Sequence, residues 1–283
     1  MSAIILDGKA IAASIRAKIK EEITQGNIKC GLAVVLVGEN EASKVYVRNK
    51  IKACTETGIK SYAYYLQEST EEDEVLQLIE ALNNDSNIHG ILVQLPLPSH
   101  ISQKKIIEAI NPKKDVDCFC AVNLGRLFLG EQGVLAPCTP SGIIEILKHS
   151  NIEISGKKAV VVGRSNIVGK PAAFLMLKEN ATVTIAHSKT EDLGAITSSA
   201  DILIVAAGKQ EIISPSMVKK GAVVIDVGIH RTENGLKGDV QYEGVSKVAK
   251  AITPVPGGVG PMTIAMLLKN TLNAAKKLVN KDS

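Results

Sequence analysis

Several features are missing from this sequence of 283 residues, and each absence excludes a class of protein. No window approaches the roughly 18 uninterrupted apolar residues of a membrane-spanning helix, so we expect no contact with a membrane. The N-terminal stretch has no basic leader, long apolar run or small-residue cleavage site, so we expect no signal peptide. The net charge is only +4 and basic residues are spread along the chain, which argues against a nucleic-acid surface. An anionic small ligand is compatible with this charge.

Cysteine is also scarce, with Cys30, Cys54, Cys118, Cys120 and Cys138 as the only five. An odd number of cysteines without an export signal indicates reduced thiols and a cytoplasmic location. Cys118 and Cys120 form a CxC pair, but no second Cys/His pair follows at metal-ligand spacing. We therefore expect unliganded thiols and no metal site.

Aromatic residues make up only 3% of the chain and tryptophan is absent, so the ring within SKVYVRNK (43–50) is informative. In a helix, Ser43, Tyr46 and Lys50 share one stripe. A stripe facing solvent would be an ordinary polar surface. A stripe facing a cleft would let the ring stack on a planar ligand and the amine carry a proton, because an ammonium removed from water releases its proton more readily. The spacing alone leaves both interpretations open.

The sequence does contain a regular alternation of short apolar runs with longer amphipathic segments, which predicts two blocks of parallel strands covered by helices. Strands are expected at 31–38, 60–66, 89–98, 157–163, 181–188, 200–208 and 221–228, with a short strand and a glycine–proline loop in 249–263. Helices are expected at 41–58 (closed by Gly58), 70–85 (capped by Thr70), 102–110, 141–150, from near Gly169, and at 264–279.

The stretch 111–138 breaks this alternation and is predicted to be irregular, as functional segments often are. The fold class is therefore α/β with two domains joined near residue 140. Ligands are expected at the carboxyl ends of the strands and in a cleft between the domains.

The segment VVVGRSNIVGKP (160–171) predicts a nucleotide-binding turn in the second block. Gly163 permits the tight turn after the strand, Ser165 replaces the second glycine of the common GxGxxG fingerprint, and Gly169 comes one position late. The backbone N–H groups of the following helix can still face a pyrophosphate. The alternative is a plain strand–helix turn.

The end of the next strand favours NADP over NAD. NAD-binding domains usually place an acid there for the ribose 2′-hydroxyl, whereas this sequence has His187 and Ser188. The missing acid, the hydroxyl and Arg164 in the glycine turn together favour a 2′-phosphate. The alternative for Arg164 is a solvated cation in a loop.

Three further features are ambiguous one by one. Gln94 ends a predicted strand before two prolines, but it could cap a neighbouring backbone. Asp115 and Asp117 lie in the irregular stretch, where an aspartate often bonds its own backbone. The segment 254–263 has enough glycine to let backbone approach a ligand, or it could be a rigid connector.

Six motifs, in order and along nearly the whole chain, resemble one family, the bifunctional methylenetetrahydrofolate dehydrogenase/cyclohydrolases. They are YVRNKIKAC (46–54), GILVQLPLP (90–98), PKKDVD (112–117), PCTPSG (137–142), VVGRSNIVGKP (161–171) and PVPGGVGPMT (254–263). The resemblance implies oxidation of 5,10-methylenetetrahydrofolate with NADP+ and hydrolysis of the methenyl product to 10-formyltetrahydrofolate, in one-carbon metabolism. It also implies a homodimer paired through the nucleotide domains.

The resemblance assigns residues to roles and domains. Lys50, Gln94 and Asp117 are implied to be catalytic, and Tyr46, Ser43, Pro256, Gly257 and Gly258 to bind the folate. The residues implied to bind NADP are Thr139 (beside Cys138), Gly163, Arg164, Ser165, Gly169, His187, Ser188 and Ile229. A folate-binding catalytic domain is expected at 1–139 plus 264–283, and a Rossmann-type NADP-binding domain at 140–263.

One departure from the family pattern concerns the run after the aspartate, which is usually DVDGF and here is DVDCFC. If the glycine needs a positive φ, Cys118 strains the turn that positions Asp117.

Three alternatives to this functional assignment stay open: a member with dehydrogenase activity only, a shikimate-type NADP dehydrogenase, and a nucleotide-sensing module without turnover. The intact Lys50 and Gln94 weigh against the first, and ILVQLPLP and PGGVGPMT against the second.

Overall fold

The computed structural model describes residues 3–233 and 235–279, and the chain divides into two compact units. The three-stranded unit comprises Ala13–Cys138 and the residues from Ile264 onward. The six-stranded unit comprises the residues up to Ala12 and Thr139–Thr263. Three helices contain residues of both units, and these are α1 (Gly8–Gln25), α6 (Cys138–His149) and α10 (Val259–Val279).

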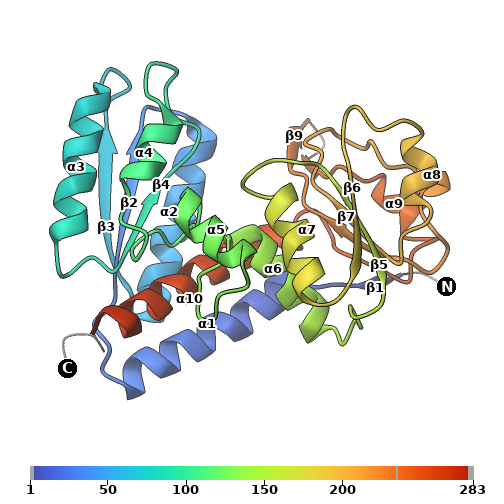
Figure 1. The fold of residues 1–283 in the computed structure, drawn as a ribbon, viewed down its shortest axis with the longest axis horizontal. Helices are drawn as coiled ribbons and strands as arrows, with labels where there is room; N and C mark the ends of the chain where they lie inside the picture. Colours follow the sequence, from blue (N-terminus) through green and yellow to red (C-terminus); the bar gives the residue numbers. More distant parts are fainter. Residues whose placement is uncertain (1–2, 234, 280–283) are drawn as a thin grey trace. The chain divides into compact units, whose positions relative to one another are not determined.

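The three-stranded unit is built on a parallel sheet in the order β3-β2-β4 (Figure 1). Every residue of β2 is buried, as expected for a central strand of a covered parallel sheet. Its strands are β2 (Gly31–Val37), β3 (Lys60–Leu66) and β4 (Gly90–Val93), and its own helices are α2 (Glu41–Thr57), α3 (Glu72–Asn84), α4 (Gln103–Ala109) and α5 (Ala121–Phe128).

The six-stranded unit holds a parallel sheet in the order β1-β11-β8-β7-β5-β6. Its strands are β1 (Ile4–Ile5), β5 (Lys158–Val162), β6 (Thr182–Ala186), β7 (Ile202–Val205), β8 (Val223–Asp226) and β11 (Ala251–Ile252). An antiparallel hairpin of β9 (His230–Thr232) and β10 (Gly235–Lys237) follows β8. Shorter helical elements are α7 (Gly169–Lys178), α8 (Leu193–Thr197), the 3-10 turn η1 (Pro215–Met217) and α9 (Tyr242–Val245).

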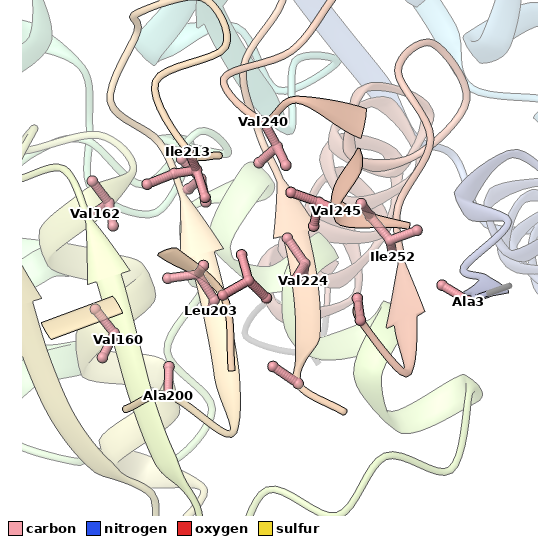
Figure 2. Close-up of a cluster of buried hydrophobic side chains, with 14 of the residues drawn as sticks. Ala3, Val160, Val162, Ala200, Leu203, Ile213, Val224, Val240, Val245 and Ile252 are labelled. Carbon is pink, nitrogen blue, oxygen red and sulfur yellow. The ribbon is translucent and has the colours of Figure 1, made fainter. Parts of the chain in front are cut away.

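Buried branched side chains from neighbouring strands form one core on the six-stranded sheet (Figure 2). Val160 and Val162 of β5 lie on the same face as Leu203 of β7 and Val224 of β8, because alternate residues of a strand share a face. These central strands are runs of Val, Ile and Leu, which explains why the sequence identifies them well.

Three expectations from the sequence need correction. The first twelve residues were expected with the first block, but β1 pairs in parallel with β11 and so places this stretch in the six-stranded unit. Thr70 was expected to cap a helix, but the N-cap of α3 is Glu71 without a side-chain bond, and the Thr70 carbonyl accepts from His100 at 3.0 Å. The stretch 111–138 contains α5 and is not wholly irregular.

Among the residues that the structure describes, no helix is both long enough and apolar enough to cross a bilayer.

Candidate active site

Helix α2 turns Ser43 and Lys50 inward. Asn40 begins the helix by accepting from the Ser43 N–H at 3.0 Å, and Gly58 ends it with φ 84°. Ser43 and Lys50 are 3% and 8% exposed, whereas Tyr46 between them is 41% exposed. The stripe is therefore no ordinary polar surface, because it carries a buried amine next to a ring with an open face.

The Lys50 amine donates to the Gln94 side-chain oxygen at 2.9 Å. Gln94 directly follows β4, and its backbone N–H donates to Val35 of the central strand at 2.8 Å. Its own amide nitrogen donates to the Leu95 carbonyl at 2.7 Å, which fixes the oxygen toward Lys50. Two residues that are 44 positions apart are thus held together by the carboxyl end of a buried sheet.

Asp117 joins this pair. An isolated bridge between Ile91 and Asp115 runs parallel to β4, so the chain brings Asp117 level with the end of that strand. Burial raises the pKa of the Asp117 carboxyl, while the neighbouring Lys50 opposes that rise. The Cys138 thiol donates to the carbonyl of Val116, the residue before Asp117, at 3.4 Å, and burial likewise raises the pKa of that thiol. Lys50, Asp117 and Cys138 therefore lie near one another within the three-stranded unit.

Cys118 has the backbone conformation that the sequence raised as a concern. Its φ is 59°, in the left-handed region where a β-carbon is disfavoured. The side chain is fully buried and its thiol donates to the Leu135 carbonyl at 3.0 Å. Burial raises the pKa of this thiol above its usual range. The turn next to Asp117 is thus strained and held by a buried contact.

The nucleotide-binding candidates follow different strands of the six-stranded sheet. Gly163 follows β5, His187 follows β6 and Ile229 lies three residues after β8. Because the strands are parallel, all of these turns lie along the edge of the sheet formed by the carboxyl ends of its strands. This edge is distinct from the lateral edge strand β6. The sheet order changes direction at β5, since β6 lies on one side of it and β7 on the other. Such a switch point is the usual ligand site of an open parallel sheet.

The altered glycine turn has the geometry of a nucleotide fingerprint. A β-carbon on Gly163 would lie 2.1 Å from the Ala206 carbonyl oxygen, and one on Gly169 would lie 2.3 Å from the Gly163 oxygen. Both positions therefore require glycine. Ser165 replaces the missing glycine by accepting from the Val168 and Gly169 N–H groups, each at 3.2 Å, at the start of α7.

The side chains around the turn suit an anion. Arg164 and Ser188 are exposed, and among the described residues Arg164 makes no ion pair. His187 is half-buried, and its Nδ1 accepts from the Lys189 N–H at 3.1 Å. With no carboxylate at the end of β6, the donor set consists of a guanidinium, hydroxyls and backbone N–H groups.

The loop after β11 carries the remaining candidates of the six-stranded unit. Gly257 has φ 108°, its carbonyl accepts from the Lys9 N–H at 2.9 Å, and a β-carbon on Gly258 would lie 2.6 Å from the Pro254 oxygen. Pro256 is exposed beside them. Thr139, at the start of α6, shares a hydroxyl–hydroxyl hydrogen bond of 2.8 Å with Thr263.

Comparisons with known proteins agree with this geometry. Residues 6–117 match the catalytic-domain model of tetrahydrofolate dehydrogenase/cyclohydrolase, and residues 137–279 match its NAD(P)-binding-domain model. The chain belongs to this family. It is 56% identical over 280 residues to the bifunctional protein FolD of Acetivibrio thermocellus, with 98% of each chain covered.

Solved structures of the family have the same fold. The bifunctional FolD methylenetetrahydrofolate dehydrogenase/cyclohydrolase of Campylobacter jejuni matches with a TM-score of 0.95 at 50% identity, covering 98% of this chain and 100% of that one. The Trypanosoma brucei FolD, solved with NADP and an inhibitor, matches with a TM-score of 0.94 at 38% identity, covering 99% of both. Membership of the tetrahydrofolate dehydrogenase/cyclohydrolase family decides against a shikimate-type enzyme and against a nucleotide module without turnover.

Some residues near the candidate site of this family member were not identified from sequence. Asn270 of α10 donates to the Val116 and Ala136 carbonyls, each at 2.9 Å, and so fixes the chain just before Asp117 and just before Cys138. His230 and Asp239, beside Ile229, bond to each other at 2.7 Å. The hydrogen-bond partners of Asn270 and Asp239 are mostly backbone groups, which leave no signal in a sequence.

Proposed function

We propose that this chain oxidises 5,10-methylenetetrahydrofolate with NADP+ and then hydrolyses the methenyl product to 10-formyltetrahydrofolate, with Lys50 as the proton carrier. The 2.9 Å contact between the buried Lys50 amine and Gln94 carries the proposal. Family membership supports the two reactions, and the assignment of residues to them rests on the geometry of the three-stranded unit.

The hydrolysis step can be written with the residues of that unit. A water oxygen bonds to the cationic methenyl carbon, and the Lys50 amine acts as the general base that takes up a proton from that water. The hydroxyl now on that carbon then loses its hydrogen as its oxygen becomes the formyl carbonyl, and the bond from the carbon to one ring nitrogen breaks. That nitrogen takes up a proton, which leaves the formyl group on the other nitrogen and releases one proton overall. Gln94, which accepts from Lys50, orients the amine toward the water.

Tyr46, Ser43 and Asp117 complete the folate site in this proposal. The open face of the Tyr46 ring, 41% exposed, suits stacking on the flat pterin or aminobenzoyl ring. The Asp117 carboxylate offers acceptors to the N–H groups of the pterin. Pro256, Gly257 and Gly258 of the six-stranded unit are also proposed to contact the folate, because backbone at glycine can be approached closely.

The donor set at the edge of the six-stranded sheet fits NADP. The exposed Arg164 and Ser188 suit the 2′-phosphate, and the missing acid at the end of β6 removes the usual partner of an unphosphorylated ribose. Ser165 keeps its hydroxyl hydrogen for a phosphate oxygen, because its oxygen accepts from the helix. Gly163, Gly169, His187, Thr139 and Ile229 shape the rest of the site. When bound, NADP+ supplies the hydride acceptor.

We also propose a homodimer that pairs through the edge strand β6. This strand ends the sheet order, so one side of its backbone has no partner in the sheet. Ile185 of β6 is 42% exposed and Leu177 of α7 is 55% exposed. An open edge flanked by apolar side chains is suited to pairing with a second copy. A cytoplasmic location fits the five free, buried cysteines.

The proposal is tested by replacing Lys50 with Met and following NADPH and the methenyl compound together, with acidified end points to separate the overlapping signals. We expect hydrolysis of the methenyl compound to fall by at least about a hundredfold, as is usual for loss of a positioned proton carrier. The exposed Lys52 on the same helix gives the matched control, and Lys52→Met should hydrolyse normally.

Each outcome of this assay is decisive. Near-normal hydrolysis by Lys50→Met would contradict the role of Lys50. NADPH with stoichiometric methenyl build-up in the unsubstituted protein would indicate a dehydrogenase whose hydrolytic step is impaired, and would point to Cys118. No NADPH with any folate would contradict the proposal as a whole.

A further inference from the structure

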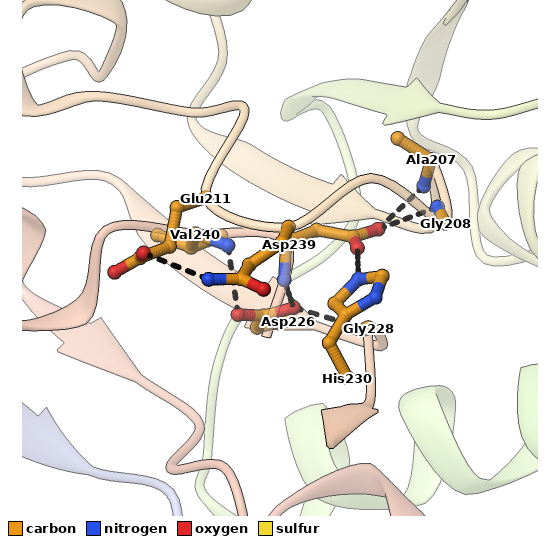
Figure 3. A network of polar contacts seen from close by, with 9 residues as sticks. Ala207, Gly208, Glu211, Asp226, Gly228, His230, Asp239 and Val240 are labelled. Carbon is orange, nitrogen blue, oxygen red and sulfur yellow. Dashed lines mark hydrogen bonds and ion pairs between the residues drawn. The ribbon is translucent and has the colours of Figure 1, made fainter. Parts of the chain in front are cut away.

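Two buried carboxylates lie behind the candidate cofactor edge, and the proposed reaction gives them no role. Asp226, at the end of β8, and Asp239, after the β9–β10 hairpin, are 2% and 0% exposed. Figure 3 shows them side by side at the carboxyl ends of β7 and β8. Burying two carboxylates is costly unless their oxygens are hydrogen-bonded, so each oxygen is expected to have a donor.

Asp226 organises the turn that follows its own strand. It accepts from the N–H groups of Gly228 at 3.0 Å, Asp239 at 2.9 Å and Val240 at 3.0 Å. A β-carbon on Gly238 would lie 1.9 Å from an Asp226 oxygen, so only glycine leaves room for this carboxylate. Asp226 thereby fixes both the start and the end of the hairpin segment.

Asp239 extends the network to the turn after the neighbouring strand β7. One of its oxygens accepts from the Ala207 N–H at 2.7 Å and from the Gly208 N–H at 2.9 Å. Its other oxygen accepts from His230 Nε2 at 2.7 Å. A β-carbon on Gly228 would lie 2.3 Å from that second oxygen, which again requires glycine. One buried side chain therefore ties the turn after β7 to the turn after β8.

Among the described residues, His230 is the only side chain that donates to these two carboxylates; the other donors are backbone N–H groups. It directly follows Ile229, which is 44% exposed at the sheet edge. An isoleucine held half in solvent at this edge provides an apolar surface for a flat ring. Its position depends on the bond that its neighbour makes to Asp239.

We propose that His230 and Asp239 form a clamp that positions the turns after β7 and β8 for the dinucleotide, and so sets its affinity. The inference rests on the proposed use of NADP. Both are positioning residues, because they act through Ile229 and the backbone of Ala207 and Gly208. Loss of the clamp should weaken cofactor binding and leave the hydrolytic groups of the three-stranded unit unaffected.

The test compares His230→Leu with His230→Gln. Leucine removes the donor and leaves the buried Asp239 oxygen unpaired, whereas the glutamine amide can donate from nearly the position of Nε2. Binding is read from the fluorescence of NADPH, which is free of tryptophan interference because the chain has none. The KM for NADP+, the KM for the folate, and hydrolysis of the methenyl compound without nucleotide are measured on the same samples.

We expect His230→Leu to weaken NADPH binding and raise the KM for NADP+ by about tenfold, as for loss of a hydrogen bond to a charged group. The folate KM and hydrolysis should stay within about twofold, and His230→Gln should restore most of the affinity. Equal affinity of His230→Leu and the unsubstituted protein would overturn the clamp. So would an equal loss in the glutamine variant, or a parallel loss of hydrolysis that reveals general unfolding. Failure of the unsubstituted protein to bind NADPH would instead contradict the cofactor proposal.

Discussion

The strained turn at Cys118 gives a prediction whose sign follows from the backbone alone. Replacing Cys118 with Ala removes the thiol and keeps the β-carbon, and replacing it with Gly removes both. At a φ of 59° the β-carbon is unfavourable, so we expect the Gly variant to be more stable than the Ala variant. At most positions the order is the reverse, because glycine has more freedom to lose on folding.

The expected difference follows from two opposing terms. A residue with a β-carbon pays about 1–2 kcal/mol in the left-handed region. Glycine loses roughly 0.5–1 kcal/mol more than alanine in conformational entropy on folding. The Gly variant should therefore exceed the Ala variant by about 0.5–1 kcal/mol. Both should be less stable than the unsubstituted protein, because the buried Cys118 thiol that donates to Leu135 is lost.

Thermal or denaturant unfolding of the two variants provides the measurement, and about 1 kcal/mol corresponds to roughly 2–4 °C in Tm for a unit of this size. Cys54 is a matched control, since it is also fully buried but lies within helix α2. There the Ala variant should be the more stable by about 1 kcal/mol. If Ala were also the better residue at position 118, the left-handed strain would not be a real property of the turn, and the argument about DVDCFC would be wrong.

Three further predictions concern the six-stranded unit. Arg164→Leu should raise the KM for NADP+ by about tenfold or more and leave that for NAD+ unchanged, because only the 2′-phosphate loses a charged partner; equal effects on both would refute the role of Arg164. Gly169→Ala should abolish cofactor binding, since its β-carbon would lie 2.3 Å from the Gly163 oxygen, and normal affinity would contradict this packing. Burial raises the pKa of Asp226 from 3.8 to about 6, so its stabilising contribution is complete below 3.8 and is lost as the pH rises through 6. Between about pH 4 and pH 7, the unfolding free energy of the unsubstituted protein should fall by about 3 kcal/mol relative to Asp226→Asn, and parallel pH profiles would refute this.

The sequence predicts best where one local pattern determines the structure. The buried strands β2 and β5 are runs of branched apolar residues, and no competing pattern overlaps them. Helix α2 has a capping asparagine and a closing glycine, so its ends are visible as well as its period. Its period places Ser43 and Lys50 on one stripe but leaves open which way the stripe faces, and in the structure both residues are buried.

Prediction from sequence fails where a structural role is filled by a residue type that rarely has that role. Helix α5 is missed because its N-cap is the Cys120 sulfur, which accepts from the Asn123 N–H at 3.4 Å and is outside the usual set of capping residues. The start of α10 at Val259 is hidden by neighbouring glycines, although Pro261 is tolerated in a first turn where its N–H is not needed. The clamp of His230 and Asp239 cannot be predicted at all, because most of its bonds end on backbone N–H groups.

The division of groups between the two units has a chemical consequence. The residues proposed to add water to the methenyl carbon, Lys50, Gln94 and Asp117, all belong to the three-stranded unit. The groups proposed to hold the nucleotide after β5, β6 and β8 belong to the six-stranded unit. Hydrolysis consumes no hydride, so it requires the folate but no nucleotide, whereas oxidation requires both. Damage at the edge of the six-stranded sheet should therefore remove the first reaction and spare the second. This asymmetry allows the effect of the His230 clamp to be separated from that of Lys50 in a single preparation.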